Sequence, residues 1–407
     1  MEWKEYQIQD VCRLINGRAY SNDEMLEHGK YKIVRVGNLS GGNSTWFYSD
    51  LELPADKYCH NGDLLFAWAC TFGPHIWKED NTIFHYHIWK IVEDKDVVDR
   101  RFFYYYLKFA TGGFLGALNG SVMVHITKSS MEKMIIRIPK KLEDQRRIAS
   151  ILSSLDRKIE LNNKINADLE EMAQAIFKNW FVDFEPFKGG KFVDSELGMI
   201  PEGWKVSQIA DIPHILETGK RPKGGAVEKG IPSVGAEHVK GMCAYDYSKT
   251  KYINCEFAAK LKTGKINGYE LMIYKDGGKP GYFIPNFSIF GEGYPFENCY
   301  LNEHVFKLDF DGNKEFNIFC YFFFKTEQIM SYFNAQGAKA AIPGINKKDV
   351  ENIYIFSPDN ESVIKFGEFA YPLFKQMLKN AIENRTLSTL RDTLLPRLMS
   401  GELEVPE

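Results

Sequence analysis

The chain has 407 residues, of which 44% are hydrophobic and 26% charged; these values exclude a disordered chain and predict two or three globular domains. Its seven cysteines are widely scattered and form no CxxC pair, which argues against a disulfide framework and a structural zinc site. The formal net charge of −3 argues against a protein that wraps DNA by itself, but agrees with DNA binding shared among several subunits.

The N-terminus is polar from its second residue, and no apolar run approaches the ~20 residues that cross a bilayer. We therefore expect no signal peptide, no contact with a membrane and a cytoplasmic location. The longest apolar run, around Ile318 to Phe324, is short and aromatic. It predicts a buried strand or helix.

The first globular segment opens with polar loops and continues into apolar strands. Arg13 and Arg18 stand in or beside such a loop, and NGDLLFAW (Asn61 to Trp68) is a turn followed by an apolar strand. In FHYHIW, His85 and His87 alternate with aromatic residues, as in a half-exposed strand. Because no cysteine or carboxylate stands at a useful spacing from them, we expect no metal site there.

A long helix is predicted over Leu142–Phe181, which contains neither proline nor glycine. Its apolar residues follow the 4-3-4-3 rhythm of a coiled-coil seam, and at ~1.5 Å per residue the helix would span ~60 Å. Asn162 and Asn166 interrupt the seam. The apolar seam positions are Ile148, Leu152, Leu155, Ile159, Leu169, Ala173, Ile176 and Trp180.

The same rhythm recurs 218 residues later, with Asn380 and Asn384 at the places of the first amide pair. Two ordinary amphipathic helices would not share such a pair, so the chain contains an internal repeat. Pro372 predicts a new helix that begins there, and Pro396 predicts its end or a bend, at a length of ~35 Å. The other repeated seam positions are Phe366, Ala370, Leu373, Met377, Leu387, Arg391, Leu394 and Leu398.

The segments that precede the two helices also correspond. MIIRIP, which ends at Pro139, matches NIYIFSP, which ends at Pro358, and NGDLLFAW matches NGYELMIY (Asn267 to Tyr274). Asn16-Gly17-Arg18 corresponds loosely to Thr218–Arg221. The Gly- and Pro-containing stretch from Phe187 to Trp204 predicts a linker into the second globular segment.

These patterns predict two globular segments joined by two long antiparallel helices, with pseudo-twofold symmetry. In that arrangement Asn162 lies near Asn384 and Asn166 near Asn380. A buried amide in a seam lowers stability but fixes register. The alternative is that these four residues are polar edge positions that face solvent.

Catalytic motifs are absent from the sequence. It contains no GxxxxGK[ST] phosphate loop, no dinucleotide fingerprint, no HExxH and no GxSxG. The Asn-Pro-Pro-aromatic motif of amino-methyltransferases is absent too. We therefore expect a protein without catalytic residues and without a metal site.

Basic residues in glycine- and proline-containing loops are candidates for DNA binding, because arginine and lysine contact phosphates and guanine edges. Several of them occur near the same point of both repeats. The alternative for each is a solvated charged loop. The candidates are Arg13, Arg18, Ser121, His125 and Lys128 in the first segment, and Lys220, Arg221, Lys223, Lys275, Lys279 and Lys339 in the second.

The chain resembles the specificity subunits of type I restriction-modification systems. IPKKLEDQRRIASILSSLDRKIELNN is similar to their central conserved region, and LSTLRDTLLPRLMSGELEV is similar to their distal conserved region. PEGWKVSQIADI resembles the opening of a second target-recognition domain, and ETGKRPKGG the loop that follows it. The resemblance implies an α+β fold, with mixed α/β target-recognition domains over 1–139 and 188–358 and conserved helical regions, which form the coiled-coil spacer, over 140–187 and 359–407.

The resemblance also implies a function. Each recognition domain would read one half of a bipartite double-stranded DNA site, and the helices would set the unread spacer. Two methyltransferase subunits, which modify adenine N6 with S-adenosylmethionine, and restriction/translocase subunits, which use ATP and Mg, would be the partners; the chain itself would bind no cofactor. The alternatives are a coiled-coil scaffold that does not bind DNA, the recognition subunit of a fused restriction-methyltransferase system, and an enzyme whose site lacks a known motif.

Overall fold

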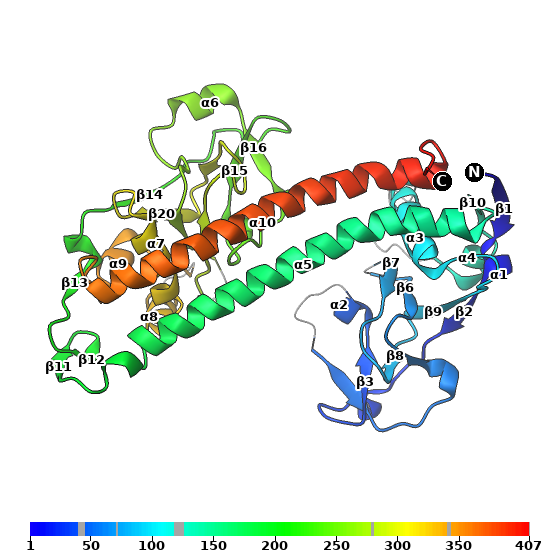
Figure 1. Ribbon diagram of the computed structural model, residues 1–407, viewed down its shortest axis with the longest axis horizontal. Coiled ribbons are helices and arrows are strands. Elements are labelled where there is room, and N and C mark those ends of the chain that lie inside the picture. The colour runs from blue at the N-terminus through cyan, green and yellow to red at the C-terminus, as the bar shows by residue number, and fades with distance from the viewer. Residues whose placement is uncertain (40–44, 71, 118–125, 278–280, 340–342, 407) are drawn as a thin grey trace. The chain divides into compact units, whose positions relative to one another are not determined.

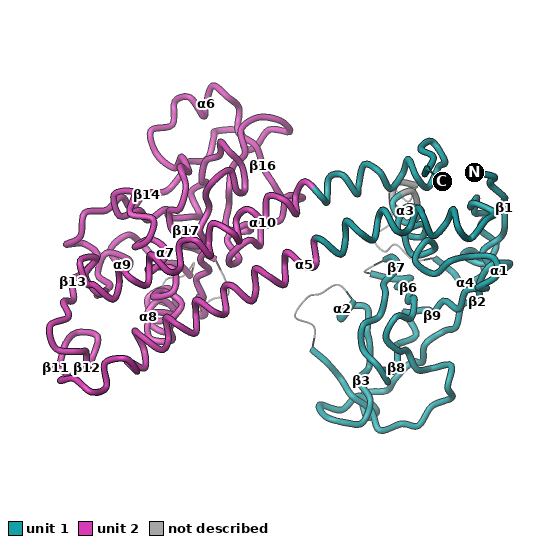
Figure 2. Tube along the Cα trace, viewed as in Figure 1, with its two compact units in different colours: residues 1–158, 387–407 teal, residues 159–386 magenta. Residues whose placement is uncertain are grey.

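The computed structural model describes residues 1–39, 45–70, 72–117, 126–277, 281–339 and 343–406. The chain divides into two compact units (Figure 2). Unit 1 consists of residues 1–158 and 387–407, and unit 2 of residues 159–386. Two long helices, α5 (Leu142–Phe181) and α10 (Glu361–Ser400), each carry the chain from one unit into the other (Figure 1).

Unit 1 is built on a central four-stranded antiparallel sheet and a second four-stranded sheet that contains one parallel pair, β3 with β8. A separate pair, β1 with β10, precedes α5. The central sheet has the order β2 (Cys12–Asn16), β9 (Ile88–Glu93), β6 (Leu64–Ala67), β7 (Gly73–Ile76); the second has the order β4 (Phe47–Ser49), β3 (Tyr31–Val34), β8 (Thr82–Phe84), β5 (Tyr58–Cys59). The remaining elements are β1 (Trp3–Gln7), β10 (Ile135–Pro139), α1 (Ile8–Val11), α2 (Val36–Leu39), α3 (Arg100–Ala117) and α4 (Lys128–Glu132).

Unit 2 repeats this topology. Its central sheet is again antiparallel, and its second sheet again contains one parallel pair, β15 with β19. The central order is β14 (Ile215–Thr218), β20 (Val305–Asp309), β17 (Glu270–Tyr274), β18 (Phe287–Phe290); the second order is β16 (Lys251–Ile253), β15 (Ile231–Val234), β19 (Tyr300–Leu301). The remaining elements are β13 (Val206–Gln208), which pairs with β21 (Tyr354–Phe356), and α6 (Cys255–Lys260), α7 (Lys314–Phe324), α8 (Glu327–Gly337) and α9 (Lys347–Glu351). The predicted internal repeat is therefore confirmed at the level of strand order.

Each long helix contributes side chains to the cores of both units. In unit 2, Phe177 and Phe181 of α5 and Phe366 of α10 pack on α7, in which every residue from Phe316 to Phe324 is buried. In unit 1, the core around α3 includes residues near the start of α5 and near the end of α10: Ile148, Ala149, Leu152, Leu395, Leu398 and Met399. Burial of these apolar faces explains why both helices remain regular over 40 residues.

The predicted helix boundary at Pro372 is wrong, and so is the shorter length. Pro372 and Pro396 lie inside α10, which is as long as α5. Phe366 and Ala370 before Pro372, and Phe374 after it, are fully buried, whereas Pro372 is exposed. The carbonyl that loses its N–H partner belongs to exposed Glu368 and can bind water instead, so core packing on the opposite face outweighs the local cost of the proline.

Two further local predictions differ from the structure. The stretch from Phe187 to Trp204 contains an antiparallel hairpin, β11 (Phe192–Ser195) with β12 (Gly198–Pro201), and its Trp204 packs against Phe181. The residues His85 to His87 form the turn between β8 and β9 rather than a half-exposed strand. In both places the short local sequence pattern does not distinguish a strand from a turn or a linker. Pairing with other parts of the chain decides which structure forms.

Candidate nucleic-acid interface

In both units a glycine packs one loop of the central sheet against one turn. The loop follows β2 in unit 1 and β14 in unit 2, and the turn leads into β9 in unit 1 and β20 in unit 2. A Cβ atom added to Gly17 would lie 2.3 Å from the carbonyl oxygen of His85, and one added to Gly219 would lie 1.6 Å from that of Leu301. The N–H of Gly17 donates to the carbonyl of Ile88 at 3.1 Å, and that of Gly219 to the carbonyl of Asn302 at 3.1 Å. No other residue type permits so close an approach, so both glycines hold a cation-bearing loop against a turn.

In unit 1 this turn carries an aromatic and imidazole cluster. The indole N–H of Trp68 donates to the carbonyl of Tyr86 at 2.8 Å, and its ring lies 4.9 Å from that of His87 in an edge-on arrangement. Trp68 also stacks on the buried ring of Trp89. The Tyr86 side chain is 41% exposed. The cluster therefore presents ring faces and hydrogen-bonding groups at the surface on a rigid base.

The imidazole of His85 is uncharged at neutral pH. Burial, followed by the positive charges of His87 and Arg35, lowers the pKa of His85 to about 4. Burial also lowers the pKa of His87. A neutral imidazole offers one donor and one acceptor, the combination that can distinguish base edges.

Arg18, a predicted DNA contact, is engaged inside unit 1. Its guanidinium donates two hydrogen bonds to the carboxylate of Glu24, at 2.8 and 2.6 Å, and lies 5.1 Å above the ring of Tyr20. The hydrogen bonds from Arg18 and from the backbone N–H of Ser21 lower the pKa of Glu24 to about 2. Contact with DNA would have to compete with this pair.

In unit 2 the corresponding turn carries a charged cluster. His304 lies between two carboxylates: its Nδ1 is 2.6 Å from Asp276, and its Nε2 is 3.3 Å from Glu303. Arg221 approaches Glu303 at 3.8 Å, and Lys275 approaches Asp276 at 3.5 Å. The two units therefore present different chemistry on equivalent loops, as expected of two surfaces that read different sequences.

The structure places the other predicted residues as follows. Arg13 is exposed on β2, Lys220 and Lys223 are exposed in the loop after β14, and the ammonium of Lys339 donates to the side-chain oxygen of Gln336 at 2.7 Å. Lys128 begins α4 and pairs with Glu132 at 3.6 Å. Ser121, His125 and Lys279 lie outside the described residues.

The equivalent of Lys128 in unit 2 is Lys347, which was not among the predicted residues. Each of the two is the first residue of a five-residue helix, after the caps Thr127 and Asn346. The ammonium of Lys347 donates to the carbonyl of Leu216.

Two lysines that sequence reasoning also missed, the buried Lys307 and the half-buried Lys90, stiffen the central sheets. Lys307 of β20 donates to the carbonyl of Lys265 at 2.7 Å and lies 2.9 Å from Glu217 and 3.7 Å from Glu270. Lys90 of β9 donates to the carbonyl of Tyr58 at 2.8 Å and lies 3.3 Å from Asp63. Both side chains occupy the third position of their strand, where the alternating pattern gave no indication of a buried charge.

The four helix amides meet in unit 2 as a hydrogen-bonded ladder between antiparallel α5 and α10. Asn162 Nδ2 donates to Asn384 Oδ1 at 2.9 Å, and Asn380 Nδ2 donates to Asn166 Oδ1 at 2.9 Å. Asn162, Asn166 and Asn380 are buried. Asn166 also donates to the carbonyl of Met377 at 3.1 Å. Three of the four amides are thus enclosed between the helices, whereas Asn384 is half-buried.

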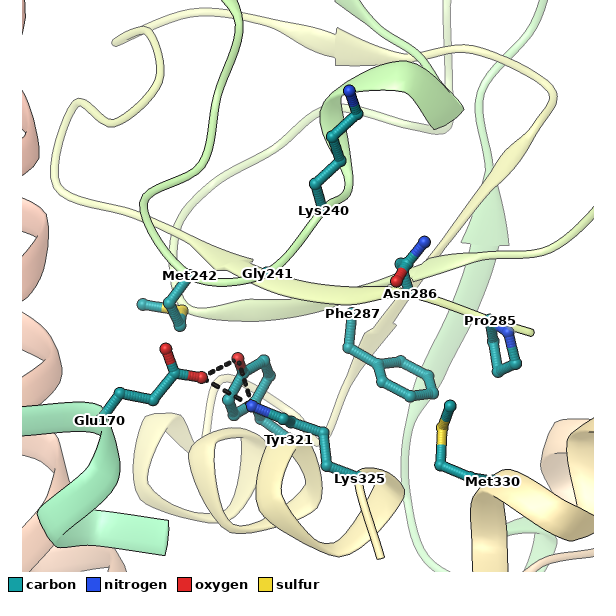
Figure 3. Close-up of a pocket in the computed structure, with 10 residues that line it drawn as sticks. All are labelled: Glu170, Lys240, Gly241, Met242, Pro285, Asn286, Phe287, Tyr321, Lys325 and Met330. Carbon is teal, nitrogen blue, oxygen red and sulfur yellow. Dashed lines mark hydrogen bonds and ion pairs between the residues drawn. The ribbon is translucent and has the colours of Figure 1, made fainter. Parts of the chain in front are cut away.

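A tyrosine of each unit donates to a carboxylate on α5. Tyr105 donates to Asp156 at 2.6 Å in unit 1, where Arg391 of α10 also binds Asp156 at 2.7 Å. Tyr321 donates to Glu170 at 2.5 Å in unit 2, where Lys325 binds the same oxygen at 2.7 Å (Figure 3). Glu170, Tyr321 and Lys325 line a pocket of about 380 Å³ beside β18. Lys240 also lines this pocket, and its ammonium extends away from Glu170 (Figure 3). These contacts attach each unit to α5.

Among the described residues, no three histidine, cysteine, aspartate or glutamate side chains gather where they could hold a metal ion. No helix in the described part of the chain is both long and apolar enough to span a bilayer.

Comparison with known proteins gives consistent results. Residues 1–171 match the family described as the type I restriction modification DNA specificity domain. The chain is 32% identical over 322 residues to the type I restriction enzyme MjaIX specificity subunit of Methanocaldococcus jannaschii, covering 77% of this chain and 71% of that protein. It is 26% identical to the HindI specificity subunit of Haemophilus influenzae, covering 99% of this chain and all of that one, 100%.

A solved structure supports the same fold. The S subunit of a type I restriction-modification system from M. genitalium superposes with a TM-score of 0.60 at 16% identity, over 98% of this chain and 96% of that one. The 32% identity to the archaeal subunit over 77% of this chain establishes that the chain belongs to the DNA specificity subunits of type I restriction-modification systems, non-catalytic proteins that recognise DNA within restriction-modification complexes.

Proposed function

We propose that each unit reads one half of a bipartite double-stranded DNA site through the loops at the ends of its central sheet. The observation that carries this proposal is the repeated glycine-locked junction, which presents imidazole and aromatic groups in unit 1 and a His304–carboxylate–Arg221 cluster in unit 2. Loops fixed on a sheet keep donors and acceptors in place for base edges. Different clusters on one topology would select different half-sites.

The spacer between the half-sites is set by α5 and α10 in this proposal. Both helices pass through the boundary between the units without a break, and the Asn162–Asn384 and Asn166–Asn380 hydrogen bonds oppose sliding of one helix along the other. A fixed helix register gives a fixed number of unread base pairs.

The partners in this proposal are two methyltransferase subunits and the restriction/translocase subunits. Large apolar side chains exposed on the helices are candidate contacts for the methyltransferases: Leu161 and Met172 on α5 and Leu390 on α10. S-adenosylmethionine, ATP and Mg would be bound by those subunits. The complex would act in the cytoplasm.

Co-expression with the methyltransferase subunit of its own genome, followed by long-read mapping of adenine N6 methylation, tests the proposal. We expect methylation at one split motif with a constant unread spacer. A stable complex that methylates no motif would instead favour a scaffold without DNA recognition. Methylation by a single co-purifying polypeptide that also cleaves DNA would point to a fused restriction-methyltransferase system.

A further inference from the structure

The outer part of unit 2, residues 219–265, is strongly basic. It runs from the locked Gly219 through β15, β16 and α6 to Lys265 (Figure 1). Its only acidic residues are Glu228, Glu237, Asp246 and Glu256. All ten of its cations are exposed: Lys220, Arg221, Lys223, Lys229, Lys240, Lys249, Lys251, Lys260, Lys262 and Lys265. We call residues 219–265 the basic lobe.

The equivalent part of unit 1 lacks this excess. The equivalence is fixed at both ends, because Gly17 matches Gly219, and Tyr58 accepts from Lys90 as Lys265 accepts from Lys307. Residues 17–58 contain five cations and six acidic residues. Four of the five cations are ion-paired: Arg18 with Glu24, Lys30 with Glu52, Lys32 with Glu79 and Lys57 with Asp56.

The cations of the basic lobe differ from these in their ion pairing. Within the described residues, three are ion-paired: Arg221, Lys249 and Lys251, at 3.4 to 3.8 Å. The other seven make no ion pair there. Unpaired like charges repel one another, and a polyanion would relieve that repulsion.

The fold brings several of these cations together. A Cβ atom on Gly264 would lie 2.6 Å from the Cα of Gly219, so the loops that carry Lys220 and Lys262 pack directly on each other. β15 and β16 pair through Ser233 and Lys251, and Val227 bridges to Tyr252, which draws the loop of Lys223 and Lys229 onto the same sheet. The loops from both ends of the lobe therefore meet beside the Arg221–Glu303 cluster.

We propose that the basic lobe binds the DNA phosphate backbone and supplies most of the salt-dependent, sequence-independent affinity of the chain, whereas unit 1 recognises its half-site with little phosphate neutralisation. The inference rests on the proposed function, because it concerns the same DNA. Each neutralised phosphate releases counterions, so the lobe should dominate the salt dependence of binding. The near-neutral charge of the whole chain thus conceals an uneven distribution.

The test uses the full chain in complex with its methyltransferase subunit. The variant Lys220→Gln/Lys223→Gln/Lys262→Gln removes three exposed charges of the lobe, and Lys191→Gln/Lys348→Gln/Lys379→Gln removes three exposed charges elsewhere in unit 2. Binding is measured from 50 to 200 mM salt on a duplex with the methylated motif and on a scrambled duplex. For the lobe variant we expect the slope of log affinity against log salt to become shallower by about 2.7, equally on both duplexes, with an unchanged methylation motif.

The outcomes separate the two proposals. If the lobe variant keeps the wild-type slope, or the control variant loses as much of it, the basic lobe is not the phosphate-binding surface. A change of one base in the motif would likewise overturn the inference, because it would make these cations base readers. Failure of the wild-type complex to methylate any split motif would instead contradict the proposed function, and with it the inference.

Discussion

Lys307 and Lys90 occupy equivalent positions in the two repeats but differ in burial and in their carboxylate partners. Each is the third residue of its strand, and each ties the segment that precedes the neighbouring strand to the central sheet. The Lys307 side chain is only 5% exposed and faces two carboxylates, whereas that of Lys90 is 13% exposed and faces Asp63. Carboxylates left alone in such a site would be poorly solvated.

Replacement of Lys307 by methionine should lower the free energy of unfolding of unit 2 by about 3–5 kcal/mol, because the buried Glu270 and the half-buried Glu217 would keep their charges without their partner. Lys90→Met should cost less in unit 1. Urea denaturation followed by the fluorescence of tryptophans in each unit measures both effects. Equal losses in the two variants would contradict the assignment of the larger role to burial.

Residue types alone could not reveal the side-chain clusters at the two equivalent turns. The sequence pointed to Arg18 and Arg221 as cations in loops, but their partners Glu24 and Glu303 are set by a tight turn in one case and by strand pairing across the sheet in the other. His85 and His87 were visible, yet their turn depends on β8 and β9 belonging to different sheets. Placing FHYHI beside LNEHV would have found the equivalent turns.

At the scale of the element, α5 and α10 were the best-predicted parts of the chain. Identical amides at identical places in a heptad frame could be recognised without any tertiary information, and Asn162 and Asn166 do face Asn384 and Asn380. The length of α10 could not be predicted, because a proline is judged from local propensity while its tolerance depends on Phe366 and Phe374, buried against α7.

The Asn166–Asn380 pair can be tested by a double-mutant cycle. Asn380→Leu leaves Asn166 Oδ1 buried without its donor, so it should lower the free energy of unfolding by about 1–3 kcal/mol. The double variant Asn166→Leu/Asn380→Leu should recover most of that loss, because both polar groups are removed together. Additive losses in denaturant unfolding would mean that the two amides do not depend on each other.

Pro372→Ala should stabilise α10. It restores an N–H donor to the exposed carbonyl of Glu368 and replaces a residue that is about 3 kcal/mol less favourable than alanine inside a helix. We expect a gain of about 1–3 kcal/mol in thermal unfolding, with Lys375→Ala, one turn away, as a control near zero. A loss of stability would show that the helix depends on the bend or rigidity of the proline.

At the scale of the whole molecule, the length of the two long helices should translate into DNA spacing. Seven residues inserted into α5 after Lys158, together with seven inserted into α10 after Thr386, lengthen each helix by ~10.5 Å and preserve the seam phase. Methylation mapping should then find both half-site sequences unchanged and a spacer ~3 base pairs longer. An unchanged spacer would mean that the helices do not act as the ruler.

The division of the chain also sets an order of events during synthesis. Unit 2 is one continuous stretch, residues 159–386, whereas the core of unit 1 needs Leu395, Leu398 and Met399 from the far end of α10, and the terminal amine of Met1 pairs with Glu404. When residue 386 has left the ribosome, all residues of unit 2 are available for folding, whereas unit 1 still lacks the last part of α10. Unit 1, most of which is translated first, is therefore completed last. Until then its incomplete core exposes apolar surface to chaperones and proteases.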